Sequence, residues 1–197
     1  MIRNSGVIID SKNLGDEWNE EIVLAEPGKE WSGTAIFTER LPRAVRLAIR
    51  LIAPRTRVDL VIAYLGKGQD ATDMDITVMH EAPETYARVT ARAALYDEAR
   101  FTFRGLLDIK KGGIGADSYL SAKALLLSEK ARAEIYPYLE IKTDAVKASH
   151  GSSIGRIDPE TLFYLQSRGM KKHDAERVVL NGFFGDLSGL TMHREPL

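Results

Sequence analysis

The chain has 197 residues, of which 27 are basic and 28 acidic, so its formal net charge is −1. This balance gives no field to attract nucleic acid or an anionic membrane, and no apolar run reaches the roughly 20 residues that span a bilayer. The absence of cysteine excludes disulfides and thiolate metal ligands from this chain. Because the start, MIRNSGVIID, lacks the layout of a signal peptide, we expect a cytoplasmic protein.

The first third of the chain predicts extended structure. Residues 1–40 indicate short extended pieces joined by turns such as EPGKEWSG, with a pairing that the sequence leaves open. From Val45 to Leu51, apolar residues alternate with arginine and alanine, which favours a strand, although a basic amphipathic helix is the alternative. The segment Ala53-Pro54-Arg55 breaks this run, and a second apolar run extends from Val58 to Leu65.

Strand-like pieces then recur at regular spacing, separated by turn residues such as YDEA and KKGGIGAD. They are DITVMHE, TYARVTARAAL, RFTFRGLLDI, SYLSAKALLL, RAEIYPYLEIK and DAVKASH. No helix-length pattern separates them, which argues against a doubly wound α/β sheet and leaves a β-sandwich or a β-solenoid. Small residues suit the narrow core of a solenoid; these are Ala91, Ala93, Ala122, Ala124 and Ala133.

The C-terminal part predicts a helical hairpin. Asp158 can cap the first helix, Pro159 fits its first position, and Gly169 can end it in a left-handed conformation. The apolar side of this helix has Leu162, Phe163 and Leu165. The second helix has an apolar stripe at helical spacing, made of Ala175, Val178, Val179, Gly182 and Phe183.

The same region carries a family resemblance. The ordered motifs KGGIGADSYLSAKALLLSEKARAEIYPYLEIKTDAVKASHG, SHGSSIGRID, LFYLQSRG and AERVVLNGF resemble the C-terminal signature of the SufB/SufD family, the scaffold proteins of iron–sulfur cluster assembly. The SHG form is closer to SufD. The resemblance implies a mainly β fold, a right-handed parallel β-helix over residues 1–155, capped by a short helical hairpin within residues 156–197.

The resemblance also implies a site at His150. It places this histidine near the position where a nascent cluster forms between two subunits, where imidazole could serve as a metal ligand. A hydrogen-bonding role at a turn is the alternative. SufD-like members often carry cysteine at the position of Ala148, and SufB-like members carry cysteine at the position of Ala131 and glutamate where this chain has Gly151. We therefore expect no stable cluster on this chain alone, and a transient cluster only in a complex.

The family further implies partners: a SufC-like ABC ATPase, and a second SufB/SufD-like subunit or a second copy of this chain. The ATPase would dock on the helical region, where the interface candidates are Phe163, Tyr164, Arg168 and Phe183. Packing of these side chains within the protein is the alternative. The chain would then be a non-catalytic scaffold subunit, with ATP hydrolysis in the partner.

Two other classes of function remain as alternatives. A β-solenoid enzyme, acting on carbohydrate or transferring acyl groups, would need a carboxylate cluster or a hexapeptide repeat, and the sequence has neither. A solenoid assembly module without a metal role fits the cysteine-free composition. The glycines at positions 112, 113 and 115 favour a solenoid turn over a phosphate loop, because no Lys-Ser/Thr follows them. His80-Glu81 does not begin an HExxH motif, since position 84 is Glu84.

Overall fold

The computed structural model describes residues 4–10, 15–39 and 41–185, of which residues 4–10 are described by their backbone alone. The chain divides into two compact units, residues 1–155 and 156–197, and residues 186–197 of the predicted helical region lie outside the described residues. None of the described helices is long and apolar enough to cross a bilayer.

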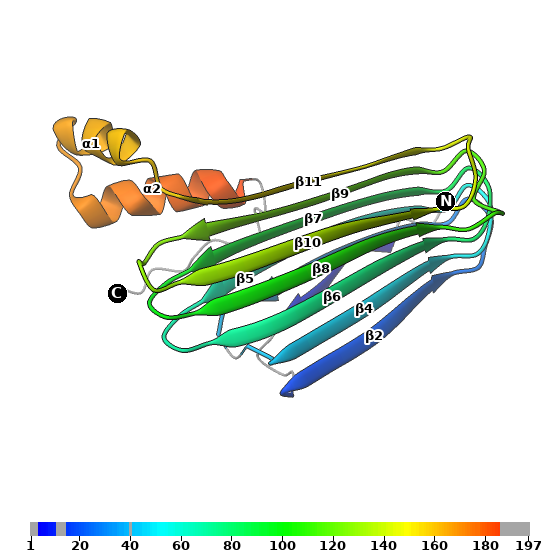
Figure 1. Cartoon of the computed structure of the whole chain (residues 1–197), viewed down its shortest axis with the longest axis horizontal. Coiled ribbons are helices and arrows are strands. Elements are labelled where there is room, and N and C mark those ends of the chain that lie inside the picture. The colour runs from blue at the N-terminus through cyan, green and yellow to red at the C-terminus, as the bar shows by residue number, and fades with distance from the viewer. Residues whose placement is uncertain (1–3, 11–14, 40, 186–197) are drawn as a thin grey trace. The chain divides into compact units, whose positions relative to one another are not determined.

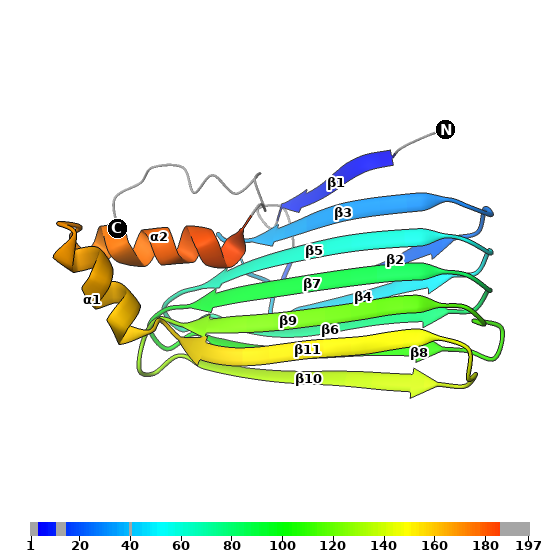
Figure 2. The same ribbon diagram turned by 90° about the horizontal axis from the view of Figure 1, so that it is seen from above.

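The first unit contains two parallel sheets (Figures 1 and 2). The six-stranded sheet has the order β1-β3-β5-β7-β9-β11, and its strands are β1 (Asn4–Asp10), β3 (Glu30–Phe37), β5 (Arg57–Gly66), β7 (Tyr86–Leu95), β9 (Asp117–Leu126) and β11 (Lys147–Arg156). The five-stranded sheet has the order β10-β8-β6-β4-β2, and its strands are β2 (Glu17–Leu24), β4 (Ala44–Leu51), β6 (Ala71–His80), β8 (Arg100–Ile109) and β10 (Arg132–Ile141).

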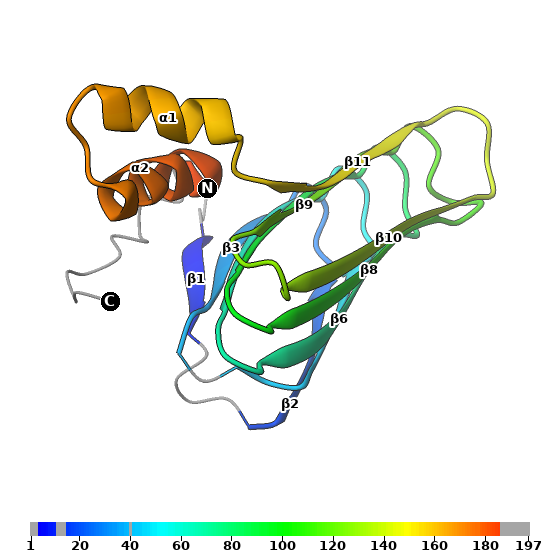
Figure 3. The ribbon, with the colours of Figure 1, turned by 60° about the vertical axis from the view of Figure 1, so that its left-hand side comes forward.

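Successive strands alternate between the two sheets, so the chain winds through about five turns of a solenoid (Figure 3). The register shows the length of a turn: Val58 pairs with Ala87, 29 positions on, and Ala87 pairs with Ser118, 31 positions on. This confirms the predicted parallel β-helix with C-terminal helices and excludes the sandwich. It also confirms that residues 45–51 form a strand.

Side chains that alternate along each strand fill the space between the two sheets. Leu60 and Ile62 from β5 and Ile49 from β4 are at most 2% exposed. The small residues predicted for a narrow core are buried in β7 and β9, where Ala91, Ala93, Ala122 and Ala124 are at most 3% exposed. Ala133 in β10 is only partly buried.

At one corner of the solenoid, successive turns each have a residue in the left-handed backbone conformation at the equivalent position. These residues are Gly28 (φ 72°), Arg55 (φ 58°), Glu84 (φ 56°) and Gly115 (φ 76°). Each donates its N–H to a carbonyl of the next turn: Gly28 to Pro54 at 2.9 Å, Arg55 to Pro83 at 3.1 Å, Glu84 to Ile114 at 2.8 Å and Gly115 to Ala145 at 2.7 Å. The glycine-rich segment at 112–115 is therefore a solenoid turn, as predicted.

The second unit contains helices α1 (Pro159–Ser167) and α2 (Lys172–Phe184), which pack against each other. Asp158 caps α1 by accepting hydrogen bonds from the N–H groups of Glu160 (3.1 Å) and Thr161 (3.2 Å). Pro159 begins α1 and Gly169 follows it with φ 89°, so these predictions are confirmed.

The apolar stripe predicted for α2 is partly wrong. Ala175 is buried, but Val178 is 46% exposed, and Gly182 is exposed. The buried positions are Ala175, Leu180 and Phe184. The buried face therefore includes Leu180 and Phe184, two large apolar side chains that bury more area than Val178 and Gly182 would.

Candidate functional site

The last turn of the solenoid, β10 and β11, has no further turn beyond it in the described chain. Each strand ends its sheet, and apolar side chains on β10 remain accessible: Leu139 is 36% exposed and Ile141 is 45% exposed. An edge strand presents unpaired N–H and C=O groups, to which another chain can add.

The two edges differ because of one proline. Arg132 donates its N–H to Ala99 and Lys142 donates to Ile109, so even-numbered residues of β10 direct their N–H groups to β8. Odd-numbered residues then face the free edge, and Pro137, at the middle of β10, has no N–H to offer there. Within the described residues β11 contains no proline, so its free edge is the better template for an added strand.

His150 lies within β11 and is exposed. The last strand-like piece predicted from the sequence, DAVKASH, ends at His150, but β11 continues through Arg156, because pairing with β9 outweighs the polar composition of this segment. Lys147 donates its N–H to Ala116 of the neighbouring turn at 2.8 Å. The alternation of a strand therefore directs the N–H groups of Ala148 and His150 toward the free edge.

The two alanines at the positions where the resemblance implies cysteine have different environments. Ala131, just before β10, is 0% exposed and belongs to the hydrophobic core, whereas Ala148 is half-buried, two residues before His150. The described residues contain no group of three or more His, Asp and Glu side chains placed to hold a metal ion. His150 therefore belongs to no such group in the described part of the chain.

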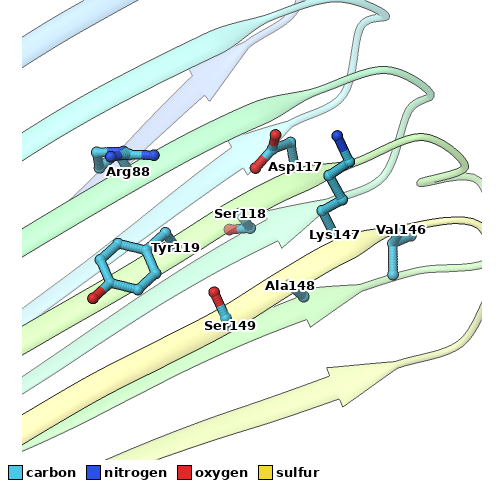
Figure 4. A pocket seen from close by; sticks show the side chains of 8 residues that line it. All are labelled: Arg88, Asp117, Ser118, Tyr119, Val146, Lys147, Ala148 and Ser149. Carbon is cyan, nitrogen blue, oxygen red and sulfur yellow. The ribbon is translucent and has the colours of Figure 1, made fainter.

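A shallow hollow of about 480 Å³ lies over β7, β9 and the start of β11. Figure 4 shows Arg88 and Tyr119 on one side of it, with Ser149 below and Asp117 and Lys147 at the opposite side. Ser118, Val146 and Ala148 complete its lining. No local sequence pattern indicates this arrangement, because Arg88, Tyr119 and Ser149 come from three successive turns.

A polar group inside the solenoid was also missed. His80 is 0% exposed; its Nδ1 lies 2.7 Å from Thr85 Oγ1 and its Nε2 lies 3.0 Å from Ser118 Oγ. The Thr85 hydroxyl donates to the carbonyl of Ala82 at 3.2 Å, so it accepts from Nδ1–H, and Nε2 accepts from the hydroxyl of Ser118.

Burial lowers the pKa of His80 to about 4, although Asp108 and Asp117 act in the opposite direction. The imidazole is therefore neutral at pH 7. Alternation along β6 could have indicated its burial, since His80 continues the inward series of Met74, Ile76 and Val78. Its partner Ser118 could not have been found, because it lies 38 positions further along the chain.

The helical unit separates the four predicted interface residues. Phe163 is 73% exposed and Tyr164 is 56% exposed, and Arg168 stacks over the Tyr164 ring at 5.3 Å. Phe183 is only partly exposed and contacts Phe184, with ring centroids 5.3 Å apart. Phe163, Tyr164 and Arg168 therefore form an exposed aromatic and cationic surface on α1, called here the α1 surface, which does not include Phe183.

By its fold the chain is a parallel β-solenoid followed by two helices, and comparison with known proteins identifies the family. Residues 36–183 match the family described as SUF system FeS cluster assembly, SufBD core domain. The chain therefore belongs to the SufBD family of the SUF system of iron–sulfur cluster assembly.

Individual relatives cover part of the chain. The iron–sulfur cluster assembly protein SufD of Bacillus subtilis is 34% identical over 125 residues, which are 64% of this chain and 29% of that protein. SufD of Escherichia coli is 35% identical over 102 residues, 52% of this chain and 24% of that protein. An iron–sulfur cluster assembly SufBD family protein of Mycobacterium bovis is 32% identical over 124 residues, 63% of this chain and 14% of that protein. The aligned regions are thus less than a third of each relative.

Proposed function

We propose that this chain is a non-catalytic scaffold subunit of a SUF-type iron–sulfur cluster assembly complex. The observation that carries the proposal is the position of His150, exposed on an edge strand with no neighbour beyond it in the described chain. Membership of the SufBD family supports it. A second subunit that adds to this edge would lie next to the imidazole, where a cluster could form between the two chains.

The partner at this edge would be a SufB/SufD-like subunit or a second copy of this chain. The β11 edge is favoured over the β10 edge because Pro137 removes a backbone donor from the middle of β10. The exposed side chains of Leu139 and Ile141 add apolar area that a partner could cover. We expect light scattering to detect a complex with such a subunit, or a dimer of this chain.

The cluster would be cargo rather than a resident cofactor. Iron–sulfur clusters are held mainly by thiolates, and this chain has none. The two relevant positions are alanines, and Ala131 is enclosed in the core, so thiolate ligands would come from a SufB/SufD-like partner, because a second copy of this chain would also lack them. His150 would contribute one imidazole nitrogen from this side of the interface.

The α1 surface would be the docking site of a SufC-like ABC ATPase. Exposed aromatic side chains with an adjacent arginine are typical anchors of protein interfaces. Closure of the ATPase on ATP would move the docked helices and alter the interface at which the cluster forms. Phe183 would support α2 from within rather than contact the ATPase, because it is only partly exposed and packs against Phe184.

Anaerobic reconstitution with iron and sulfide tests the scaffold role. We expect no iron–sulfur absorbance with this chain alone, and absorbance after a SufB-like subunit and a SufC-like ATPase are added. His150→Ala should lower the yield of the complete mixture while the melting temperature of the chain stays unchanged. Ser153→Ala, an exposed change on the same strand, is the matched control. A near-stoichiometric cluster on this chain alone, or an unchanged yield with His150→Ala, would contradict the proposal.

Binding titrations with a SufC-like ATPase test the docking site. Phe163→Ala and Arg168→Ala should weaken binding by about tenfold each, with little loss of thermal stability because both side chains are exposed. Val178→Ala, an exposed apolar change on the other helix, should bind as the parent does. If the two α1 variants also bind as the parent does, the α1 surface is not the docking site.

A further inference from the structure

Among the described residues, Arg88 has no ion-pair partner, whereas Arg46, Arg50 and Arg104 on the five-stranded sheet and Arg57 on the six-stranded sheet each have one. On the five-stranded sheet, arginines lie within ion-pair distance of carboxylates: Arg46 of Glu17 at 3.3 Å, Arg50 of Glu81 at 2.7 Å and Arg104 of Asp73 at 3.3 Å. On the six-stranded sheet, Arg88 forms no ion pair within the described residues. Its guanidinium carbon lies 5.7 Å from the ring centroid of Tyr86 and 5.5 Å from that of Tyr119.

The guanidinium of Arg88 makes cation–π contacts with both tyrosine rings, of which the Tyr86 ring is shared with Arg57, whose guanidinium carbon lies 4.2 Å from its centroid. Such contacts use the face of the guanidinium and leave its N–H groups available as donors. A guanidinium that is positioned but has no carboxylate partner is suited to bind an anion from outside the chain.

The hollow beside Arg88 supplies further polar groups. Figure 4 shows the Ser149 hydroxyl directed into the same space, with Asp117 and Lys147 on the opposite side. Lys147 donates its N–H to the carbonyl of Ala116, and Asp117 donates its N–H to the carbonyl of Thr85. Lys147 therefore lies beside Asp117, on the adjacent strand. These two opposite charges offset each other, so the charge of Arg88 leaves the lining with a net charge of +1.

Gly151 leaves room for the side chain of Tyr119 at the wall of this hollow. A Cβ atom at Gly151 would lie 2.9 Å from the hydroxyl oxygen of Tyr119, closer than a van der Waals contact allows. A side chain at position 151 would therefore displace the Tyr119 hydroxyl, so glycine favours the ring position that contacts Arg88. The position of Arg88 is in this way determined by three successive strands, β7, β9 and β11.

We propose that this hollow binds a carboxylate group, with Arg88 as the principal ligand and Ser149 as a second donor. The planar fork of an arginine matches the two oxygens of a carboxylate. A monoanion also neutralises a lining of net charge +1, whereas a phosphate dianion would leave it negative. The carboxylate belongs either to a free small organic acid or to a polypeptide, through a glutamate side chain or a C-terminus.

Amide chemical shifts of the isotope-labelled full chain test the site on titration with sodium acetate, against sodium chloride at equal ionic strength. We expect saturable shifts at Tyr119, Ser149 and Gly151 with acetate and none with chloride. Arg88→Gln should weaken binding by about tenfold or more, and Arg88→Lys should weaken it less, because the charge remains without the fork. Arg46→Gln, on the other sheet, is the matched control and should bind as the parent does.

Two further titrations define the ligand. A blocked Gly-Glu-Gly peptide that binds more tightly than acetate assigns the site to a polypeptide carboxylate, and equal affinities assign it to free small acids. Tighter binding of inorganic phosphate than of acetate would overturn the proposal, as would unsaturable shifts or equal shifts in the parent and Arg88→Gln. The spectrum of each variant shows directly whether it is folded.

Discussion

Strands β8 and β10 are neighbours in one sheet and carry the same apolar residues at two matched positions, yet they differ in burial. Leu107 pairs with Leu139 and Ile109 pairs with Ile141. Leu107 and Ile109 are 0% exposed, whereas Leu139 and Ile141 are 36% and 45% exposed. The difference comes from position alone, because a side chain in a solenoid is enclosed only when a turn lies on each side of it. The last turn is therefore stabilised less than the turns before it.

The largest expected effect comes from truncating the matched pair. Leu107→Ala should lower the free energy of unfolding by about 2–5 kcal/mol, since it removes a fully buried side chain and leaves a cavity. Leu139→Ala should cost about 1 kcal/mol or less, because part of that side chain is already hydrated. Denaturant unfolding of the two variants measures both values, and equal costs would mean that the two turns are not distinct.

The stability of the solenoid interior should depend on pH through the buried His80. Because the pKa of His80 is about 4 in the folded protein and near 6.5 in the unfolded chain, the unfolded chain binds more protons between these values. Stability should therefore be complete above pH 6.5 and fall by about 3 kcal/mol as the pH is lowered toward 4. Unfolding curves at pH 7, 6 and 5 keep most carboxylates ionised. His80→Gln should flatten this dependence, and an unchanged slope in that variant would show that His80 is not its cause.

A partner should reduce the contrast between the two strands. If a second subunit covers the last turn, as proposed above, Leu139→Ala should weaken the complex by about 1 kcal/mol, while Leu107→Ala should lower stability without changing affinity in the folded protein. Affinity measured well below the melting temperature of each variant makes the comparison. A partner affinity that Leu139→Ala leaves intact would place the interface elsewhere.

The smallest effect is expected at the β10 edge. Because the nitrogen of Pro137 faces away from β8, Pro137→Ala should change stability by less than about 1 kcal/mol. It adds a donor to the free edge and should increase self-association on that side. Sedimentation velocity at several concentrations measures the change, with Ser153→Ala as a control on the other edge. A loss of several kcal/mol would instead place the Pro137 nitrogen toward β8.

The sequence predicts the strands from Val45 onward because their alternation and turn residues are local properties. It also predicts the cap at Asp158 and the end of α1 at Gly169, which depend on a few adjacent residues. The identity of Leu139 says nothing of its exposure, which depends on the turn that follows. The end of β11 was missed for a similar reason: its polar residues are held in a strand by pairing with β9.

The candidate site residues also differ in whether a local sequence pattern could indicate them. His150, Phe163 and Tyr164 were singled out because each belongs to a continuous motif, and each is exposed. The contacts of Arg88 with Tyr119, and of His80 with Ser118, join residues 31 and 38 positions apart. One long-range pattern is visible in the sequence: Pro27, Pro54 and Pro83 each precede a left-handed corner residue.

These corners also give the fold a unit of length. Arg55 and Glu84 are equivalent residues 29 positions apart, each preceded by proline. Excision of residues 55–83 would join Pro54 to Glu84 and recreate the same corner, with one turn fewer and both ends unaltered. Because each turn contacts only its neighbours, a shortened or lengthened protein should lose or gain stability in steps of one turn. The architecture thus permits growth by duplication of a whole turn, with the open edge and its histidine carried unchanged at the end.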